Sequence, residues 1–262
     1  MAPMHEPTPP ASPAHASRQT LDFFSRYLDV EHPQTWSVDD LQQQLAVVHP
    51  HLAPANQDLT RHVATIDSVT AERLKLARLT IDLVRALLPR GPGNQFKHLS
   101  QVGVEPYWRV RHCRDNVSEW AHNGITPYSR THIHLWANTA IKWEAGNCCE
   151  YALVTFSILA SLAELREARL EIVQHAQADH QWVMLRGETA DQDIVVDPWA
   201  LFPTPCLRAD AASTLGCTHN GTGDGVDASL KVLAVKIPGE SWPPLDISAA
   251  MTRRGLVSHR DL

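Results

Sequence analysis

A helix with a clear start signal, followed by short strands, lies between residues 146 and 197 and constrains the fold more than any other feature. Gly146 interrupts whatever precedes it, and Asn147 is a residue type that caps helix N-termini well. Glu150 stands three residues after Asn147, which is the spacing of a capping box. Cys148 is therefore predicted to be the first helical residue. The apolar residues behind it recur at helical spacing: Ala152, Phe156, Leu159 and Leu162.

The chain after this helix is typical of short strands separated by polar turns. Folding about the last of these turns, at 187–192, would bring His180 beside Asp197. The pattern predicts an α+β fold in which the helix packs on a small antiparallel sheet. The strands that we expect here are at 168–173, 180–185 and 193–197.

A thiol, an imidazole and a carboxylate occupy matching positions on these elements. Cys148 opens the helix, His180 opens one strand and Asp197 closes the next. Nucleophilic acyl transfer uses these parts, because a thiol needs a base and the base needs a third group that fixes its tautomer. The positive end of a helix dipole also favours a thiolate. The sequence therefore predicts a catalytic triad, with the backbone N–H of Cys148 in the oxyanion hole. Two carboxylates nearer the turn, Asp191 and Asp193, are expected to be solvated and dispensable.

The adjacent Cys149 is a second candidate nucleophile, because it lies about 100° away around the helix and periodicity does not choose between the two. A family resemblance favours Cys148. The segment resembles the core of the transglutaminase-like superfamily of papain-like thiol enzymes, and the match covers about a fifth of the chain. The resemblance implies that Cys148 is the nucleophile, His180 the base and Asp197 the orienting carboxylate. The matching residues are Gly146, Cys148, Glu150, Tyr151, Ala152, His180, Trp182, Asp197 and Pro198.

The resemblance implies a papain-like core that attacks a carboxamide or peptide carbonyl and forms a thioester. Water as acceptor would make the protein a cysteine protease or a glutamine deamidase, and a lysine amine would make it a transglutaminase. The triad leaves these three chemistries open. Arylamine N-acetyltransferases share the Cys-His-Asp order, but their cysteine lies much nearer the N-terminus. A catalytically silent, protein-binding version of the core is the alternative outside enzymology, and the intact triad argues against it.

The rest of the chain is predicted to form two further parts before a catalytic domain at 91–262. The first 20 residues hold five prolines and no Leu, Ile, Val or Phe, so 1–18 is expected to be a disordered leader. A helical N-terminal region should follow at 19–90. The leader resembles the export leaders of bacterial type III effectors, which suggests an effector that acts on a host protein. The further elements expected are helices at 21–30, 37–48, 59–88 and 130–143 and a strand at 230–237.

Composition excludes several other classes. A net charge of −6 argues against a nucleic-acid surface. No apolar stretch reaches the ~20 residues that span a bilayer. Five cysteines, two of them adjacent, suit no even disulfide framework and indicate a reducing compartment such as the cytosol, including a host cytoplasm reached by type III secretion.

Fifteen histidines raise the question of a metal site. His132 and His134 fall in the stretch that we expect to be helical, where residues two apart diverge. The soft ligands Cys206, Cys217 and His219 match no known zinc spacing. The chain also lacks a phosphate-binding glycine loop, so we expect neither a metal nor a cofactor. The four tryptophans before the nucleophile are expected to pack in the core: Trp108, Trp120, Trp136 and Trp143.

Overall fold

The computed structural model describes residues 66–262, except 176–178, 201–202, 209–210, 212–229 and 254–262. The predicted leader at 1–18 and the helices predicted at 21–30 and 37–48 lie outside these residues. The chain divides into two compact units, Met1–Ala71 and Glu72–Leu262. The description below concerns the second unit, which holds every candidate site residue.

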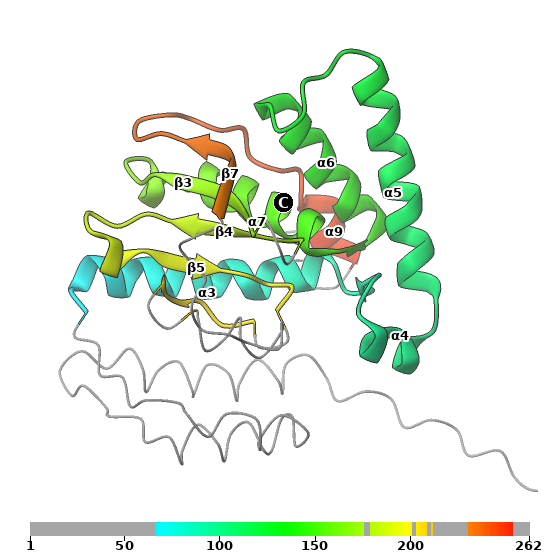
Figure 1. The fold of residues 1–262 in the computed structure, drawn as a ribbon, viewed down its shortest axis with the longest axis horizontal. Coiled ribbons are helices and arrows are strands. Elements are labelled where there is room, and N and C mark those ends of the chain that lie inside the picture. Colours follow the sequence, from blue (N-terminus) through cyan, green and yellow to red (C-terminus); the bar gives the residue numbers. More distant parts are fainter. Residues whose placement is uncertain (1–65, 176–178, 201–202, 209–210, 212–229, 254–262) are drawn as a thin grey trace, which may run out of the picture. The chain divides into compact units, whose positions relative to one another are not determined.

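A five-stranded antiparallel sheet runs through this unit in the order β6-β5-β4-β3-β7 (Figure 1). The strand predicted at 180–185 is confirmed residue for residue, and the three others that were predicted are confirmed within two residues at each end. With helices packed beside this sheet, the fold is a mixed α+β arrangement, as predicted. The strands are β3 (Leu170–His175), β4 (His180–Leu185), β5 (Ile194–Val196), β6 (Cys206–Leu207) and β7 (Leu230–Lys236).

Three helices form successive layers beside the sheet. Helix α7 (Cys148–Ser161) packs on β3 and β4, α6 (Arg130–Trp143) packs on α7, and α5 (Glu105–His122) packs on α6. All residues of α7 from Cys149 to Ala160 are buried, which explains why its apolar residues extend around the whole helix. Among the described residues, no helix is both long enough and apolar enough to cross a bilayer. The other helices are α3 (Ser68–Leu87), α4 (Phe96–Val102) and α9 (Ser248–Arg253).

Helix α5 was not predicted from the sequence, whereas α6 was predicted with the bounds it has. The buried apolar residues of α5 are few, and they are Val110, Cys113 and Val117 at spacings of three and four. Charged and polar residues between them mask this narrow stripe. This stripe, together with Pro106 in the first turn, was the sequence signal from which α5 could have been predicted.

The start of α7 is held by a short parallel ladder between β1 (Gly91–Pro92) and β2 (Ala145–Gly146). The glycine at 146 is required by space, because a Cβ there would lie 2.6 Å from the Cβ of Glu150. The ladder brings Gly93 beside the first residues of α7, and the backbone N–H of Gly93 donates to Asn147 Oδ1 at 3.0 Å. This ladder and the Gly93 contact therefore support the cysteine helix.

Candidate active site

Cys148 is the first residue of α7, as the sequence predicted, and the local contacts fix its position. The predicted capping box is present, and the backbone N–H of Asn147 donates to Glu150 Oε2 at 2.8 Å. The thiol therefore sits at the positive end of a well-capped helix.

The two adjacent cysteines have different surroundings. Cys148 is half-buried, and its Sγ lies 3.7 Å from the backbone oxygen of Asp179. Cys149 is 6% exposed, and its Sγ lies 3.9 Å from the hydroxyl of Tyr128. Burial raises the pKa of the Cys149 thiol well above its ordinary value, so Cys149 remains protonated. Of the two thiols, Cys148 is the more accessible.

His180 and Asp197 form a buried pair. His180 Nε2 lies 2.6 Å from Asp197 Oδ2. The other carboxylate oxygen, Oδ1, accepts the backbone N–H groups of Trp199 at 3.1 Å and Ala200 at 3.3 Å. Because Val183 pairs with Val196, the register places Asp197 opposite Trp182, two residues from His180 on the same face of the sheet. The hairpin thus brings the two residues together as the sequence predicted.

Two tryptophans enclose the imidazole. The His180 ring stacks on Trp182 with centroids 5.4 Å apart and lies 4.8 Å from the ring of Trp199. Trp199 is held in turn, because its Nε1 donates to Asn94 Oδ1 at 3.3 Å and its backbone oxygen accepts from Gln95 Nε2 at 2.8 Å. The ring orientation is therefore fixed by packing as well as by Asp197.

The surroundings favour the charged form of the imidazole. Burial by itself works to lower the pKa of His180, but the charge and hydrogen bond of Asp197 outweigh it, and the nearby Cys148 adds to them. The pKa of His180 is therefore raised to about 10. Since Asp197 occupies Nε2, Nδ1 is the ring nitrogen left for the thiol. The structure therefore pairs His180 with Asp197 and places Cys148 near the imidazole.

Cys148 lies on the wall of a cavity of about 390 Å³. Most of the wall is polar, and it takes residues from α5, α6 and the turn before it, α7 and the start of β4. The lining residues are Asn94, Arg114, Val117, Ser118, Tyr128, Trp136, Asn147, Cys148, Cys149, Asp179 and Gln181.

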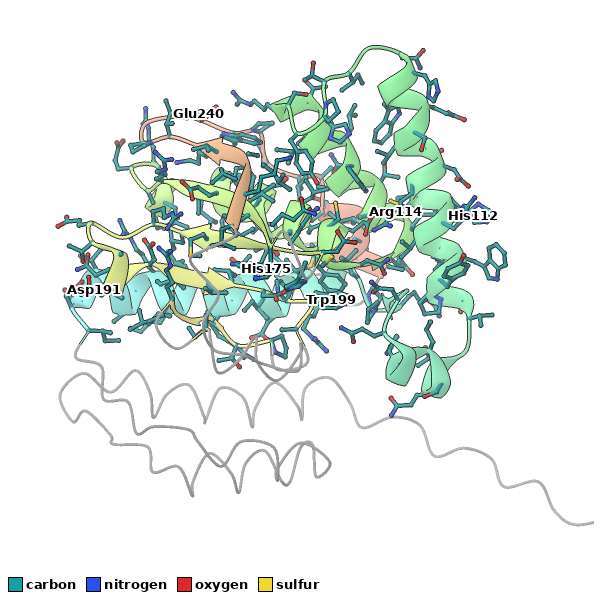
Figure 2. The ribbon with its side chains drawn as sticks, viewed as in Figure 1. His112, Arg114, His175, Asp191, Trp199 and Glu240 are labelled. Atoms are coloured by element: carbon teal, nitrogen blue, oxygen red, sulfur yellow. The ribbon has the colours of Figure 1, made fainter. Side chains whose placement is uncertain are left out.

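Arg114 is a site residue that the sequence did not reveal. Arg114, which is labelled in Figure 2, comes from α5, and its Nε and Nη2 donate to Glu150 Oε1 at 2.9 Å and Oε2 at 3.1 Å. Glu150 is 0% exposed, and a carboxylate so buried needs a charged partner. The sequence signal for such a partner was Glu150 itself. It stands at a capping position of a helix that is apolar on every side, so its carboxylate is expected to be buried beside a cation from a neighbouring element.

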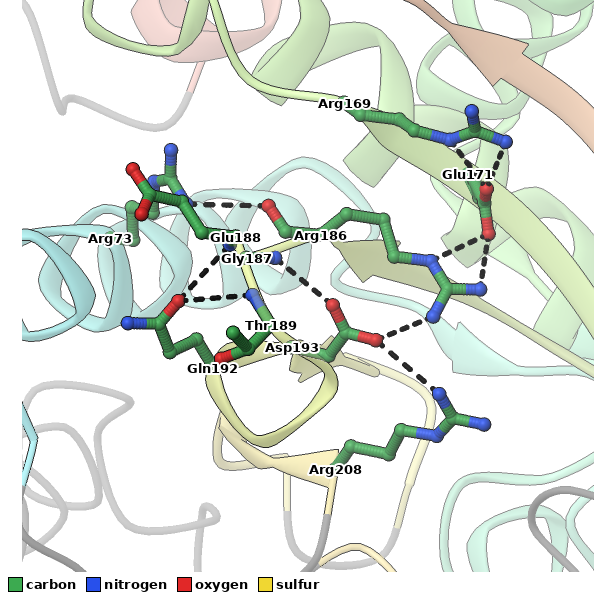
Figure 3. A network of polar contacts seen from close by, with 10 residues as sticks. All are labelled: Arg73, Arg169, Glu171, Arg186, Gly187, Glu188, Thr189, Gln192, Asp193 and Arg208. Carbon is green, nitrogen blue, oxygen red and sulfur yellow. Dashed lines mark hydrogen bonds and ion pairs between the residues drawn. The ribbon is translucent and has the colours of Figure 1, made fainter.

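The prediction that Asp193 is a solvated carboxylate is wrong, whereas Asp191 is exposed as predicted. Asp193 is buried, and its Oδ2 accepts from Arg186 Nη1 at 2.5 Å (Figure 3). Arg186 also donates to Glu171, which pairs in turn with Arg169. The turn after β4 folds back over this network, because the backbone N–H of Gly187 donates to Asp193 Oδ1 at 3.0 Å.

Trp136 lines the cavity beside Cys148, and other candidates lie apart from it or outside the described residues. Trp108 is 55% exposed, so its predicted place in the core is wrong. His132 is buried on α6, where its Nδ1 accepts from the backbone N–H of Tyr128 at 3.2 Å. Cys217 and His219 lie outside the residues that the structure describes. Among those it does describe, no group of three or more His, Cys, Asp and Glu side chains could hold a metal ion.

Comparison with known proteins assigns no family. No protein-family model matches the chain, and no curated protein matches it. The function must therefore be inferred from the chemistry of the site itself.

Proposed function

We propose that this protein is a thiol-dependent acyl-transfer enzyme that acts on amide or peptide bonds of a protein. One observation carries the proposal: a buried His180–Asp197 pair, 2.6 Å apart, lies near a half-buried thiol at a helix N-terminus. A structural cysteine needs no such pair. A nucleophile does, because the imidazolium stabilises the thiolate and can later release a proton.

The steps follow from the three residues. The Cys148 thiolate attacks the carbonyl carbon, and the negative charge that moves onto the oxygen is stabilised by the Cys148 backbone N–H. As the C–N bond breaks, protonated His180 gives its proton to the departing amine and a thioester remains. Neutral His180 then takes a proton from the attacking water or amine, the C–S bond breaks, and the thiolate returns. Asp197 stabilises the imidazolium in both steps without being protonated.

The proposal includes a core of the transglutaminase-like, papain-like type. The order of helix, strands and triad residues supports it, as does the position of Cys148 at the start of the central helix. The proposed setting is a reducing cytosol, with the protein delivered as a secreted bacterial effector that acts on a host protein. This setting rests on the leader and on the cysteine content.

Alkylation tests the nucleophile. Iodoacetamide at about pH 6.5 should label Cys148 before every other cysteine, because its thiol is accessible and lies beside an imidazolium. Peptide mass mapping after short exposures measures the order of labelling. Cys148→Ala should abolish acyl transfer, and the matched Cys149→Ala variant should keep most of it. Equal, slow labelling of Cys148 and Cys149 would contradict the proposal and favour a silent binding module.

Mass spectrometry of a treated cell lysate separates the three chemistries. Wild-type protein should produce conversion of Gln to Glu, new cross-links or new N-termini, according to whether the protein is a deamidase, a transglutaminase or a protease. Cys148→Ala is the control, and changes that appear with both proteins do not come from this site. The absence of all three changes in a lysate that contains host proteins would argue against a protein substrate.

A further inference from the structure

The cavity beside Cys148 presents two sets of N–H donors that make no hydrogen bond to any residue that the structure describes. The first belongs to Arg114, whose Nε and Nη2 are committed to Glu150. Its Nη1 has no hydrogen-bond partner among the described residues, and the side chain is 44% exposed on the cavity wall. Burial works to lower the pKa of Arg114, but the hydrogen bond and charge of Glu150 outweigh it, and thiolates at Cys149 and Cys148 would raise it further.

The second donor is the amide of Gln181. Residues alternate along β4, so Gln181 points away from the face that carries His180 and Trp182. It is 9% exposed, and its Oε1 accepts the hydroxyl proton of Tyr128 at 3.1 Å. That hydroxyl also lies 3.9 Å from Cys149 Sγ, which brings Gln181 to the α7 side of the sheet.

The Tyr128 contact orients the amide. Burial raises the pKa of Tyr128, so the phenol keeps its proton and remains a donor to Oε1. The amide nitrogen is then the part of the Gln181 side chain that is available to a ligand in the cavity. This nitrogen has no hydrogen-bond partner in the part of the chain that the structure describes, although the side chain as a whole is nine-tenths buried.

We infer that this cavity binds an acyl group that carries a carboxylate, held by Arg114 Nη1 and Gln181 Nε2 beside the attacked carbonyl. Both unused groups only donate, and a carboxylate only accepts. Charge-assisted hydrogen bonds to a guanidinium are also about twice as strong as neutral ones. A volume of about 390 Å³ accommodates an acidic side chain together with part of the neighbouring backbone. The inference rests on the proposed function, because it takes Cys148 as the nucleophile.

The cavity also holds one exposed carboxylate, Asp179, which accepts from Gln174 Nε2 at 3.2 Å. Its side chain is engaged by the β3 strand, whereas Arg114 and Gln181 come from α5 and β4. The alternative explanation of Arg114 is that it only neutralises Glu150. A test must therefore remove the positive charge without leaving the Glu150 carboxylate unpaired.

Two alkylating agents of similar size give that test, because iodoacetate is anionic and iodoacetamide is neutral. Both form an S–CH₂ bond to the thiolate as iodide leaves. The measured quantity is the ratio of the iodoacetate rate to the iodoacetamide rate at Cys148. His180 attracts iodoacetate as well, but it is present in every variant, so changes in the ratio report the cavity donors.

The decisive variant combines Arg114→Gln with Glu150→Gln, which keeps hydrogen-bonding groups at both positions. Its ratio should fall about tenfold from that of wild type, the size expected for a lost hydrogen bond to a charged group. Glu150→Gln alone keeps the guanidinium and should keep a wild-type or higher ratio. Arg111→Gln, which removes an exposed charge on the same helix, should leave the ratio unchanged.

Gln181→Met provides a second route if the double variant does not fold, and its ratio should fall about threefold for the loss of one hydrogen bond from a neutral donor. An unchanged ratio in both the double variant and Gln181→Met would overturn the inference, and Arg114 would then serve only to hold Glu150. Failure of the proposed function is a different result: Cys148 would react with iodoacetamide no faster than Cys149, whatever the ratio.

Discussion

Each end of the β4–β5 hairpin holds a buried carboxylate that is paired with a basic side chain, and the two pairs differ in their chemistry. At one end Asp197, just after β5, lies 2.6 Å from His180, the first residue of β4. At the other end Asp193, just before β5, lies 2.5 Å from Arg186, which follows β4. Both carboxylates are nearly inaccessible, and both stabilise the same pairing of strands.

The difference lies in the partner and in the neighbourhood. A guanidinium stays protonated at any physiological pH, so the Asp193 pair can only hold the turn together. An imidazole can take and release a proton, and His180 lies near the thiol of Cys148, which lines a cavity. Burial and ion pairing therefore do not distinguish a candidate active site from a structural network. A group that can take and release a proton near an accessible thiol does distinguish a candidate active site from such a network.

The largest expected effect comes from Asp197→Asn. The amide can hold the ring, but it favours the wrong tautomer and cannot stabilise the imidazolium, so turnover should fall by about 10³ to 10⁴-fold while the protein stays folded. Rates measured on folded protein, with circular dichroism as the check, test this. Combining it with His180→Ala should cost little more than the worse single change, because the members of one constellation are not additive. Multiplied losses would mean that the two residues act separately.

Asp193→Asn should lower the stability of the protein and leave its rate of turnover nearly unchanged. Losing the charge leaves Arg186 with one carboxylate partner, Glu171, so the unfolding free energy should drop by about 2 to 3 kcal/mol. The rate per folded molecule should stay within about twofold of wild type, because no atom of this network reaches the cavity. Urea unfolding and active-site titration measure the two quantities. A large loss of rate in the folded variant would show that the two ends of the hairpin are coupled.

The pH dependence of the unfolding free energy should also distinguish the His180–Asp197 pair from the Arg186–Asp193 pair. The pKa of His180 is raised from its ordinary value of 6.5 to about 10, so between these values the folded protein holds a proton that the unfolded chain has released. The stabilisation by this pair is complete below about pH 6.5 and is lost as the pH rises through about 10. The difference in unfolding free energy between wild type and Asp197→Asn should therefore shrink across this window. The difference for Asp193→Asn should stay level, because Arg186 keeps its proton.

The smallest expected effect is that of Arg208→Gln within the structural network. Arg208 Nη1 lies 3.4 Å from Asp193 Oδ2, farther than the Arg186 contact to the same atom. Its removal should lower the unfolding free energy by less than about 1 kcal/mol. Arg186→Gln, measured beside it by urea unfolding, should cost several times more because it breaks contacts to two buried carboxylates. Equal losses of unfolding free energy in the two variants would mean that the number of positive charges, and not the geometry of their contacts, stabilises this end of the hairpin.

Helix and strand positions near the site could be predicted from sequence because their signals are local. The capping residues Asn147 and Glu150 lie within one turn of Cys148, and a short polar turn joins β4 to β5. Helix α5 was missed because only a narrow stripe of its surface is apolar, and such a stripe becomes informative only when the packing partner is known. Asp193 was placed wrongly for a related reason, since a carboxylate near a turn is usually exposed.

What the sequence determined by itself is the identity and order of the reactive groups: a thiol at a helix start, an imidazole at a strand start and a carboxylate at the end of the next strand. Capping, alternation and turn chemistry act between residues close in the chain, so they can be read without a structure. Only the tertiary structure decided that Cys148 is accessible and Cys149 buried, that Arg114 reaches Glu150, and that Asp193 closes an ion network. Burial and ion pairing depend on elements that are distant in sequence, and their energies exist only once those elements pack together.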